Sequence, residues 1–141
     1  MQRRQAREAV LQALFQVDVG KVAVDDAITY AVMFNELTGD AEEFCRSLFQ
    51  GVIAKQTSID QTIERLAVDW SLHRLGNVDR NVLRIALYEL MYREDIPVGA
   101  TINEAVEIAK AFGNNNSGRF INGILGQFTR DDDHGGAESE R

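Results

Sequence analysis

The chain has 141 residues, of which 45% are hydrophobic, so it is long enough to form one domain with a buried core. It contains no apolar run of the roughly 20 residues that a membrane helix needs, and its N-terminus lacks the apolar segment and cleavage site of a secretory signal. Its single cysteine, Cys45, excludes an intramolecular disulfide, so we expect a cytoplasmic protein.

The net charge of −7 argues against a broad nucleic-acid-binding face, but the charge is unevenly distributed. Residues 131–141 hold five acidic residues and one arginine, whereas Arg3, Arg4 and Arg7 make the other end basic. We therefore expect any nucleic-acid site to be small and local. The acidic segment is too polar to fold alone, so we predict a helical domain at 1–130 and a disordered tail at 131–141.

Apolar residues recur at spacings of three and four along most of the chain, and no window alternates convincingly with period two. This pattern predicts an all-α fold of seven helices. Asp and Ser residues mark several of the helix starts, because their side-chain oxygens can accept backbone N–H groups. Five of the predicted helices have both ends assigned: 3–18, Asp25 or Asp26 to about Leu37, Asp79 to Met91, 102–112 and Ser117 to Phe128. Two more are predicted to start at Asp40 and at Ser58. A short turn or helix is predicted at 70–76.

The helix that begins near Asp79 is predicted to be the centre of the fold. Its apolar residues extend so far around the cylinder that it must be largely enclosed. We expect a single helical bundle in which two small helix groups share this central helix. Pro97 prevents its continuation, and Gly113 is predicted to end the next helix in the left-handed region. In the second helix the residues assigned to the buried side are Ile28, Ala31, Val32 and Met33.

Three motifs and the arginine-rich start carry a resemblance to a known family. The motifs are VLRIALYEL at 82–90, INEAVEIAKAFG at 102–113 and S-x-x-F-x-N-G-x-L at 117–125, and the start reads RRQARE at 3–8. In this order they are similar to the NusB family of bacterial transcription antitermination factors. The resemblance implies a NusB-like, RNA-binding helical domain and a non-enzymatic adaptor. With the small-subunit ribosomal protein NusE, such adaptors recognise boxA RNA in ribosomal RNA leaders and help RNA polymerase resist termination.

The basic start is the first candidate for RNA contact. Guanidinium groups match phosphate oxygens bidentately, whereas cations at a helix N-terminus oppose the helix dipole. Three arginines at this position therefore indicate a use other than stability, although a solvated, frayed helix start is the alternative. We expect that replacing both Arg4 and Arg7 by alanine weakens RNA binding without lowering the melting temperature. With the resemblance added, the predicted RNA-binding residues are Arg3, Arg4, Arg7, Phe15, Asn116, Ser117, Arg119 and Phe120.

The segment between the last two helices leaves one alternative open. Phe120 either stacks on an RNA base or belongs to the core with Ile124 and Leu125. The polar residues at 115–117 could offer hydrogen bonds to an unpaired base edge. Residues 113–118 superficially resemble a phosphate-binding loop, but Arg119 and Phe120 replace its Lys and Ser/Thr, so we reject nucleotide binding.

The sequence offers no catalytic or metal-binding pattern and implies no cofactor. His73 and His134 are the only histidines, and Cys45 lies on an apolar helix face, where a small buried thiol is expected. The resemblance implies that Asp79 and Glu104 face NusE, and an acidic body suits a basic ribosomal protein. From the residues alone, a solvated helix face is the simpler interpretation of Glu104.

Two other functions remain as alternatives. NusB-like domains also occur fused to ribosomal RNA methyltransferases, so the chain could be the RNA-targeting domain of an RNA-modifying system, but it has no room for a cofactor-binding domain. It could also be a self-associating helical protein whose homodimer masks the RNA surface.

Overall fold

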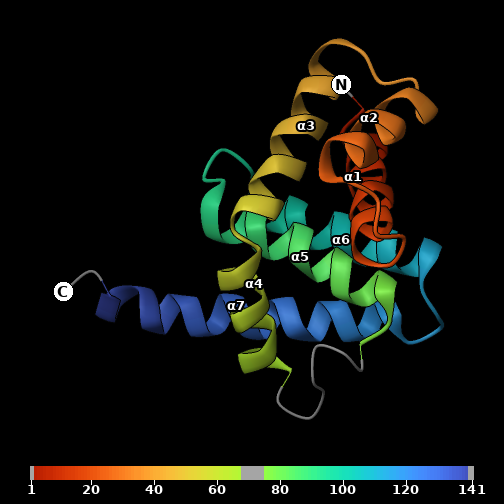
Figure 1. The fold of residues 1–141 in the computed structure, drawn as a ribbon. Helices are drawn as coiled ribbons and strands as arrows, with labels where there is room; N and C mark the ends of the chain where they lie inside the picture. The colour runs from red at the N-terminus through yellow and green to blue at the C-terminus, as the bar shows by residue number, and fades with distance from the viewer. Residues whose placement is uncertain (1, 68–74, 140–141) are drawn as a thin grey trace.

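The computed structural model describes residues 2–67 and 75–139, with side chains as far as Asp131. Within these ranges the chain forms seven α-helices and no strand, so the all-α prediction is confirmed. None of the helices described there is both long and apolar enough to cross a membrane. The helices are α1 (Arg3–Asp18), α2 (Val24–Phe34), α3 (Gly39–Ala54), α4 (Gln56–Leu66), α5 (Asn77–Tyr92), α6 (Val98–Phe112) and α7 (Ser117–Ser139) (Figure 1).

Helix α5 is the element that the other helices share. It contacts α1, α3, α4, α6 and α7. On one side of it α1 packs against α2 and α3, and on the other side α6 packs against α7 (Figure 1). The predicted arrangement of two helix groups around a central helix agrees with these contacts.

The side chains of α5 explain why this helix is central. Every residue from 81 to 87 is buried, including the polar residues Asn81 and Arg84. Leu83 and Leu87 are fully buried and belong to a single apolar core that also includes residues of the other six helices. Burial of a leucine side chain contributes about 1.5–3 kcal/mol. The packing of α5 inside the bundle therefore stabilises the fold more than helix propensity does.

The predicted helix caps are wrong in detail. Asp25, Asp26, Asp40 and Asp79 all lie within the first turns of their helices, and the N-cap positions are held by Ala23, Thr38 and Gly76 without side-chain cap hydrogen bonds. Acidic residues in a first turn still stabilise the helix, because they face the positive end of its dipole. Helix α4 begins at Gln56, two residues before the predicted Ser58. Helix α6 begins at Val98, with Pro97 as its N-cap residue.

Helix α2 differs most from its prediction. It ends at Phe34 instead of near Leu37, and Met33 is 69% exposed, so its assignment to the buried side is wrong. Consecutive helix residues point about 100° apart. Because Ala31 and Val32 face the core, Met33 is turned away from it.

The turn between α6 and α7 also corrects a prediction. Gly113 has a φ of −97° and a ψ of −159°, which is extended and not left-handed backbone. Ser117 is the first residue of α7, and its Oγ accepts a hydrogen bond from the Asn114 N–H at 3.0 Å. The Asn114 Oδ1 in turn accepts from the Asn116 N–H at 2.8 Å. Ser117 and Asn114 thus fix the turn together, and Ser117 is not the predicted cap.

The structure does not test two of the predictions made from the sequence. Residues 68–74, which contain most of the segment expected to be a short turn or helix, lie outside the described residues, although Leu75 is buried. The backbone of α7 is helical as far as Ser139, beyond the predicted boundary at 130. The division into a folded domain and a disordered tail remains a prediction.

Candidate nucleic-acid interface

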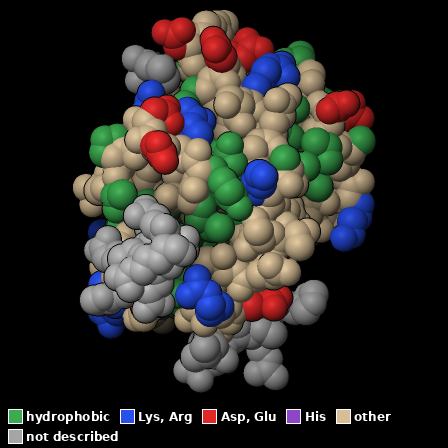
Figure 2. Space-filling model, turned by 90° about the vertical axis from the view of Figure 1, so that its left-hand side faces the viewer, with side chains coloured by type: hydrophobic (Ala, Val, Ile, Leu, Met, Phe, Trp, Pro, Cys, Tyr) green, Lys and Arg blue, Asp and Glu red, His purple; other side chains and the backbone are tan. Residues whose placement is uncertain are grey.

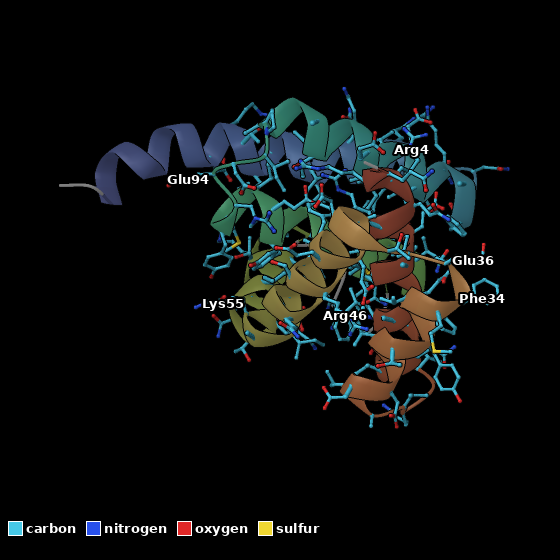
Figure 3. All side chains as sticks on the ribbon, turned by 90° about the horizontal axis from the view of Figure 1, so that it is seen from above. Arg4, Phe34, Glu36, Arg46, Lys55 and Glu94 are labelled. Carbon is cyan, nitrogen blue, oxygen red and sulfur yellow. The ribbon has the colours of Figure 1, made fainter. Side chains whose placement is uncertain are left out.

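The N-terminal turn of α1 is bound to α6 by an arginine–glutamate pair. Arg4 donates from Nε to the Glu104 Oε2 at 2.6 Å and from Nη2 to Oε1 at 3.1 Å. Figure 3 labels Arg4 at the N-terminal end of α1, beside the last two helices. The hydrogen bond and charge of Arg4 lower the pKa of Glu104, and the same contacts raise the pKa of Arg4. Arg4, which the sequence analysis predicts to contact RNA, is therefore bound to Glu104, which it predicts to contact the partner protein.

Arg7 is in a different environment. Its Nε and Nη2 donate to the two carboxylate oxygens of Glu89 on α5 at 2.7 and 2.9 Å, and both side chains are almost fully buried. The Thr101 hydroxyl donates to the Glu89 Oε1 at 2.7 Å, which ties α6 to the same carboxylate. Arg7 was predicted from the sequence as an RNA contact, with a solvated helix start as the alternative, whereas the structure places its side chain in a buried ion pair. Arg7 joins α1 to α5 and is not exposed for phosphate contact.

The buried ring of Phe44 on α3 organises the neighbouring arginines. The guanidinium carbons of Arg3, Arg7 and Arg93 lie 4.8, 5.4 and 5.6 Å from the ring centroid, within cation–π range. Arg93 also donates twice to Asp95 at 2.9 Å, and this hydrogen bonding lowers the pKa of Asp95 to about 2. The sequence analysis did not single out Phe44 as a platform or Arg93 as its neighbour, because neither residue stands in a motif.

The other predicted RNA residues lie farther along α1 and at the start of α7. Phe15 is 41% exposed, and both Asn116 and Arg119 are exposed. Arg119 makes no hydrogen bond or ion pair with any other side chain in the part of the chain that the structure describes. Ser117 is buried by its role in the turn, so its hydroxyl is not presented to solvent. Phe120 is partly buried against the core. It is therefore neither a fully exposed ring for base stacking nor a fully buried core residue, which were the two alternatives from the sequence.

Asp79 and Glu104 lie on α5 and α6, which pack against each other. Asp79 is partly exposed, but its Oδ1 is buried and has no hydrogen-bond partner among the described residues. The Glu104 side chain is 25% exposed. The two carboxylates therefore lie on helices that pack together, but no hydrogen bond between described atoms joins them, and their contact with a partner protein remains a prediction.

An apolar groove between α1 and α2 was missed by the sequence analysis. It has a volume of about 580 Å³. Tyr30 and Phe34 are 71% and 80% exposed, and Phe34 projects away from the bundle in Figure 3. Such an exposed apolar surface is typical of an interaction site. The residues that line the groove are Gln12, Gln16, Val22, Ala27, Tyr30, Ala31 and Phe34.

The histidine, cysteine and acidic side chains of the described residues form no candidate metal centre. No group of three or more His, Cys, Asp or Glu side chains within the described part of the chain could hold a metal ion. Cys45 is fully buried, so the prediction of a buried thiol is confirmed, and burial raises the pKa of this thiol to about 12. His73 and His134 lie outside the described side chains. The face in Figure 2 shows basic and acidic side chains interspersed between apolar areas, without a continuous basic stripe.

Comparison with known proteins gives a consistent result. The model of the NusB family matches residues 4–130. The transcription antitermination protein NusB of Bacillus subtilis is 46% identical over 131 residues, which cover 93% of this chain and 97% of that protein. The protein of the same name from Heliobacterium modesticaldum is 47% identical, and the match covers 93% of this chain but only 64% of that longer protein.

Solved structures agree with this match. The T. maritima NusB structure has a TM-score of 0.86 and 40% identity, covering 92% of each chain. A chain in a crystal structure of the antitermination factors NusB and NusE in complex with double-stranded RNA has a TM-score of 0.84 and 25% identity. That match covers 92% of this chain and 96% of the other.

Proposed function

Because the chain belongs to the NusB family of transcription antitermination proteins, we propose that it is a non-enzymatic RNA-binding adaptor that acts together with NusE. In this role it recognises boxA-like RNA and helps elongating RNA polymerase resist termination. The observation that carries the proposal is the close similarity of its fold to a chain in a complex of NusB, NusE and RNA.

The proposed RNA surface combines positive charge with an exposed aromatic ring. Arg3, Arg4 and Arg119 supply guanidinium groups for phosphate oxygens, and Phe15 supplies a ring on which a base can stack. Asn116 offers an amide for an unpaired base edge, which is the usual target of sequence-specific RNA recognition. Arg7 and Ser117 are buried and support this surface indirectly. The hydrogen bond of Arg7 to Glu89 holds α1 against α5, and the hydrogen bond from Asn114 to Ser117 fixes the turn before α7. Phe120 contributes through its exposed part.

The proposed NusE surface lies on α5 and α6. Asp79 and Glu104 present carboxylates there, and the chain as a whole is acidic. A basic ribosomal protein would be attracted by this charge, which favours correct orientation and rapid association.

Arg119 provides the sharpest test of the RNA surface. Replacing Arg119 by alanine should weaken binding of a boxA RNA and reduce the salt slope of log K by about 0.7, the value for one lost phosphate contact on a single strand. The matched control is Arg130→Ala, because Arg130 is also an exposed arginine of α7. Fluorescence anisotropy at several salt concentrations measures both effects. Equal losses in the two variants would contradict the proposed site.

Self-association is the second candidate function, and the apolar groove favours it. A second copy seated on Tyr30, Met33 and Phe34 of α2 would lie on the side of the bundle where α2 packs against α1, the helix that carries the exposed Phe15. A homodimer of this kind would store the protein with part of its RNA surface covered. Light scattering with and without RNA tests this. A monomer at all concentrations, or a dimer that Phe34→Ser leaves unchanged, would exclude it.

A further inference from the structure

The exposed pair between Arg4 and Glu104 connects the two proposed surfaces. Arg4 uses Nε and Nη2, and both carboxylate oxygens of Glu104 are engaged. The side chains are 52% and 25% exposed, so each can be reached from solvent. The pair therefore differs from the buried pair of Arg7 and Glu89, which no ligand can reach without opening the bundle.

The arrangement places Glu104 in competition with RNA. A guanidinium group binds a phosphate bidentately through one of its edges, as it binds a carboxylate. Glu104 already fills the Nε–Nη2 edge of Arg4, and its negative charge repels a phosphate that approaches the remaining nitrogen. Arg4 can serve the RNA fully only when the Glu104 carboxylate is withdrawn or neutralised.

We propose that Glu104 is a positioning residue that withholds Arg4 from RNA until a basic partner takes the Glu104 carboxylate. This inference rests on the proposed function, since it requires an RNA that contacts Arg4 and a partner that contacts Glu104. A lysine or arginine of NusE that binds Glu104 releases the guanidinium of Arg4 to a phosphate. Because coupling between two binding sites is reciprocal, RNA that binds Arg4 raises the affinity for NusE by the same factor.

Helix α1 is suited to this exchange. The buried pair at Arg7 holds the helix against α5, so the backbone of α1 stays in place when the exposed pair opens. Only the side chain of Arg4 has to move. Exposed ion pairs are worth little in water, so an incoming charged group can replace either partner.

The test compares Glu104→Gln with Glu107→Gln, using a short boxA RNA without any partner. Both changes remove one negative charge from α6, but Glu107 is paired with Lys110 at 3.7 Å and makes no hydrogen bond to Arg4. Glu104→Gln should raise RNA affinity about two- to five-fold, as expected for release of an exposed ion pair. Glu107→Gln should raise it clearly less. The gain should disappear in the double variant Arg4→Gln, Glu104→Gln.

The second measurement is the ratio of RNA affinities with saturating NusE and without it. The wild-type chain and Glu107→Gln should show the same ratio, and Glu104→Gln should show a smaller one. Lower RNA affinity in Glu104→Gln would mean that Glu104 prepares Arg4 for RNA, and the competition would be refuted. Equal behaviour of the two glutamate variants would also refute it, while leaving the proposed function intact. If the wild-type chain binds neither RNA nor NusE, both proposals fail.

Discussion

Arg4 and Arg7 lie three residues apart on α1, yet their surroundings give them different roles. The partner of Arg7 is Glu89, which is 82 residues away in the sequence, and the pair is buried. No local pattern could have revealed this contact. The charge, the spacing and the family resemblance all grouped Arg7 with Arg3 and Arg4, whereas tertiary packing separated it from them.

Replacing Arg7 by alanine should therefore destabilise the fold. The change leaves the Glu89 carboxylate buried without its cation, which typically lowers the free energy of unfolding by about 3–5 kcal/mol. Arg4→Ala removes a solvent-exposed pair and should leave the free energy of unfolding almost unchanged. Urea denaturation of both variants measures the difference. Equal stabilities would contradict the buried pair and would restore the earlier expectation that the double alanine variant keeps its melting temperature.

At the scale of helices, periodicity predicted the elements better than their ends. The helices were recognised because each has apolar residues at spacings of three and four. The starts of α1 and α7 were predicted correctly. The starts of α2, α3, α5 and α6 were misplaced, because their N-cap positions are occupied by residues that are not typical caps or were not chosen as caps: Ala23, Thr38, Gly76 and Pro97. Those positions are decided by how the preceding turn packs, which the local sequence does not specify.

Contact between α3 and α5 depends on a glycine. A Cβ atom at Gly51 would overlap the ring of Tyr88, so the two helices approach closely at this point. Gly51→Ala should destabilise the fold by about 1–3 kcal/mol through overpacking. Gly123→Ala is the control, because a Cβ atom there meets nothing within 4 Å and alanine favours a helix interior by about 0.5–1 kcal/mol. Thermal melting should shift in opposite directions for the two variants, and shifts of the same sign would contradict this packing.

The C-terminal end of α1 is held to α5 by Asp18. Its Oδ2 accepts hydrogen bonds from Arg80 at 2.7 and 3.0 Å and lies 3.4 Å from Arg84. Burial raises the pKa of this carboxyl, but the hydrogen bonds and charges of the two arginines outweigh burial and lower it below 3.8. A carboxyl with a lowered folded-state pKa stabilises the protein fully above its unfolded pKa and loses that contribution as the pH falls through the folded value.

The stability of the wild-type chain should therefore fall as the pH is lowered below about 4. In Asp18→Asn this part of the pH dependence should be missing, and the variant should be less stable than the wild type near neutral pH. Urea denaturation between about pH 7 and pH 2.5 gives both curves. Parallel curves would show that Asp18 does not link α1 to α5 in this way.

At the scale of the whole molecule, the fold and the family were predictable, while the site was predictable only in part. The motifs at 82–90 and 102–113 span the central helix α5, which contacts five of the other helices, and its neighbour α6. The exposed groove at Tyr30 and Phe34 was not predicted, because an exposed aromatic residue looks the same in sequence as a buried one. The pairing of Arg4 with Glu104 could not be predicted either, because the fold brings together two residues that are 100 positions apart in the sequence.

The most direct test of the adaptor function is binding of a short boxA RNA and of a scrambled RNA, each with and without NusE, at two salt concentrations. We expect weak binding by the chain alone, and tighter, sequence-selective binding when NusE is present. With NusE present, the arginines of this chain should contribute about −2 to the salt slope, because roughly three of them contact phosphates at about −0.7 each. If NusE forms no complex with the chain and neither RNA is preferred, the adaptor function is contradicted, although membership of the NusB family remains.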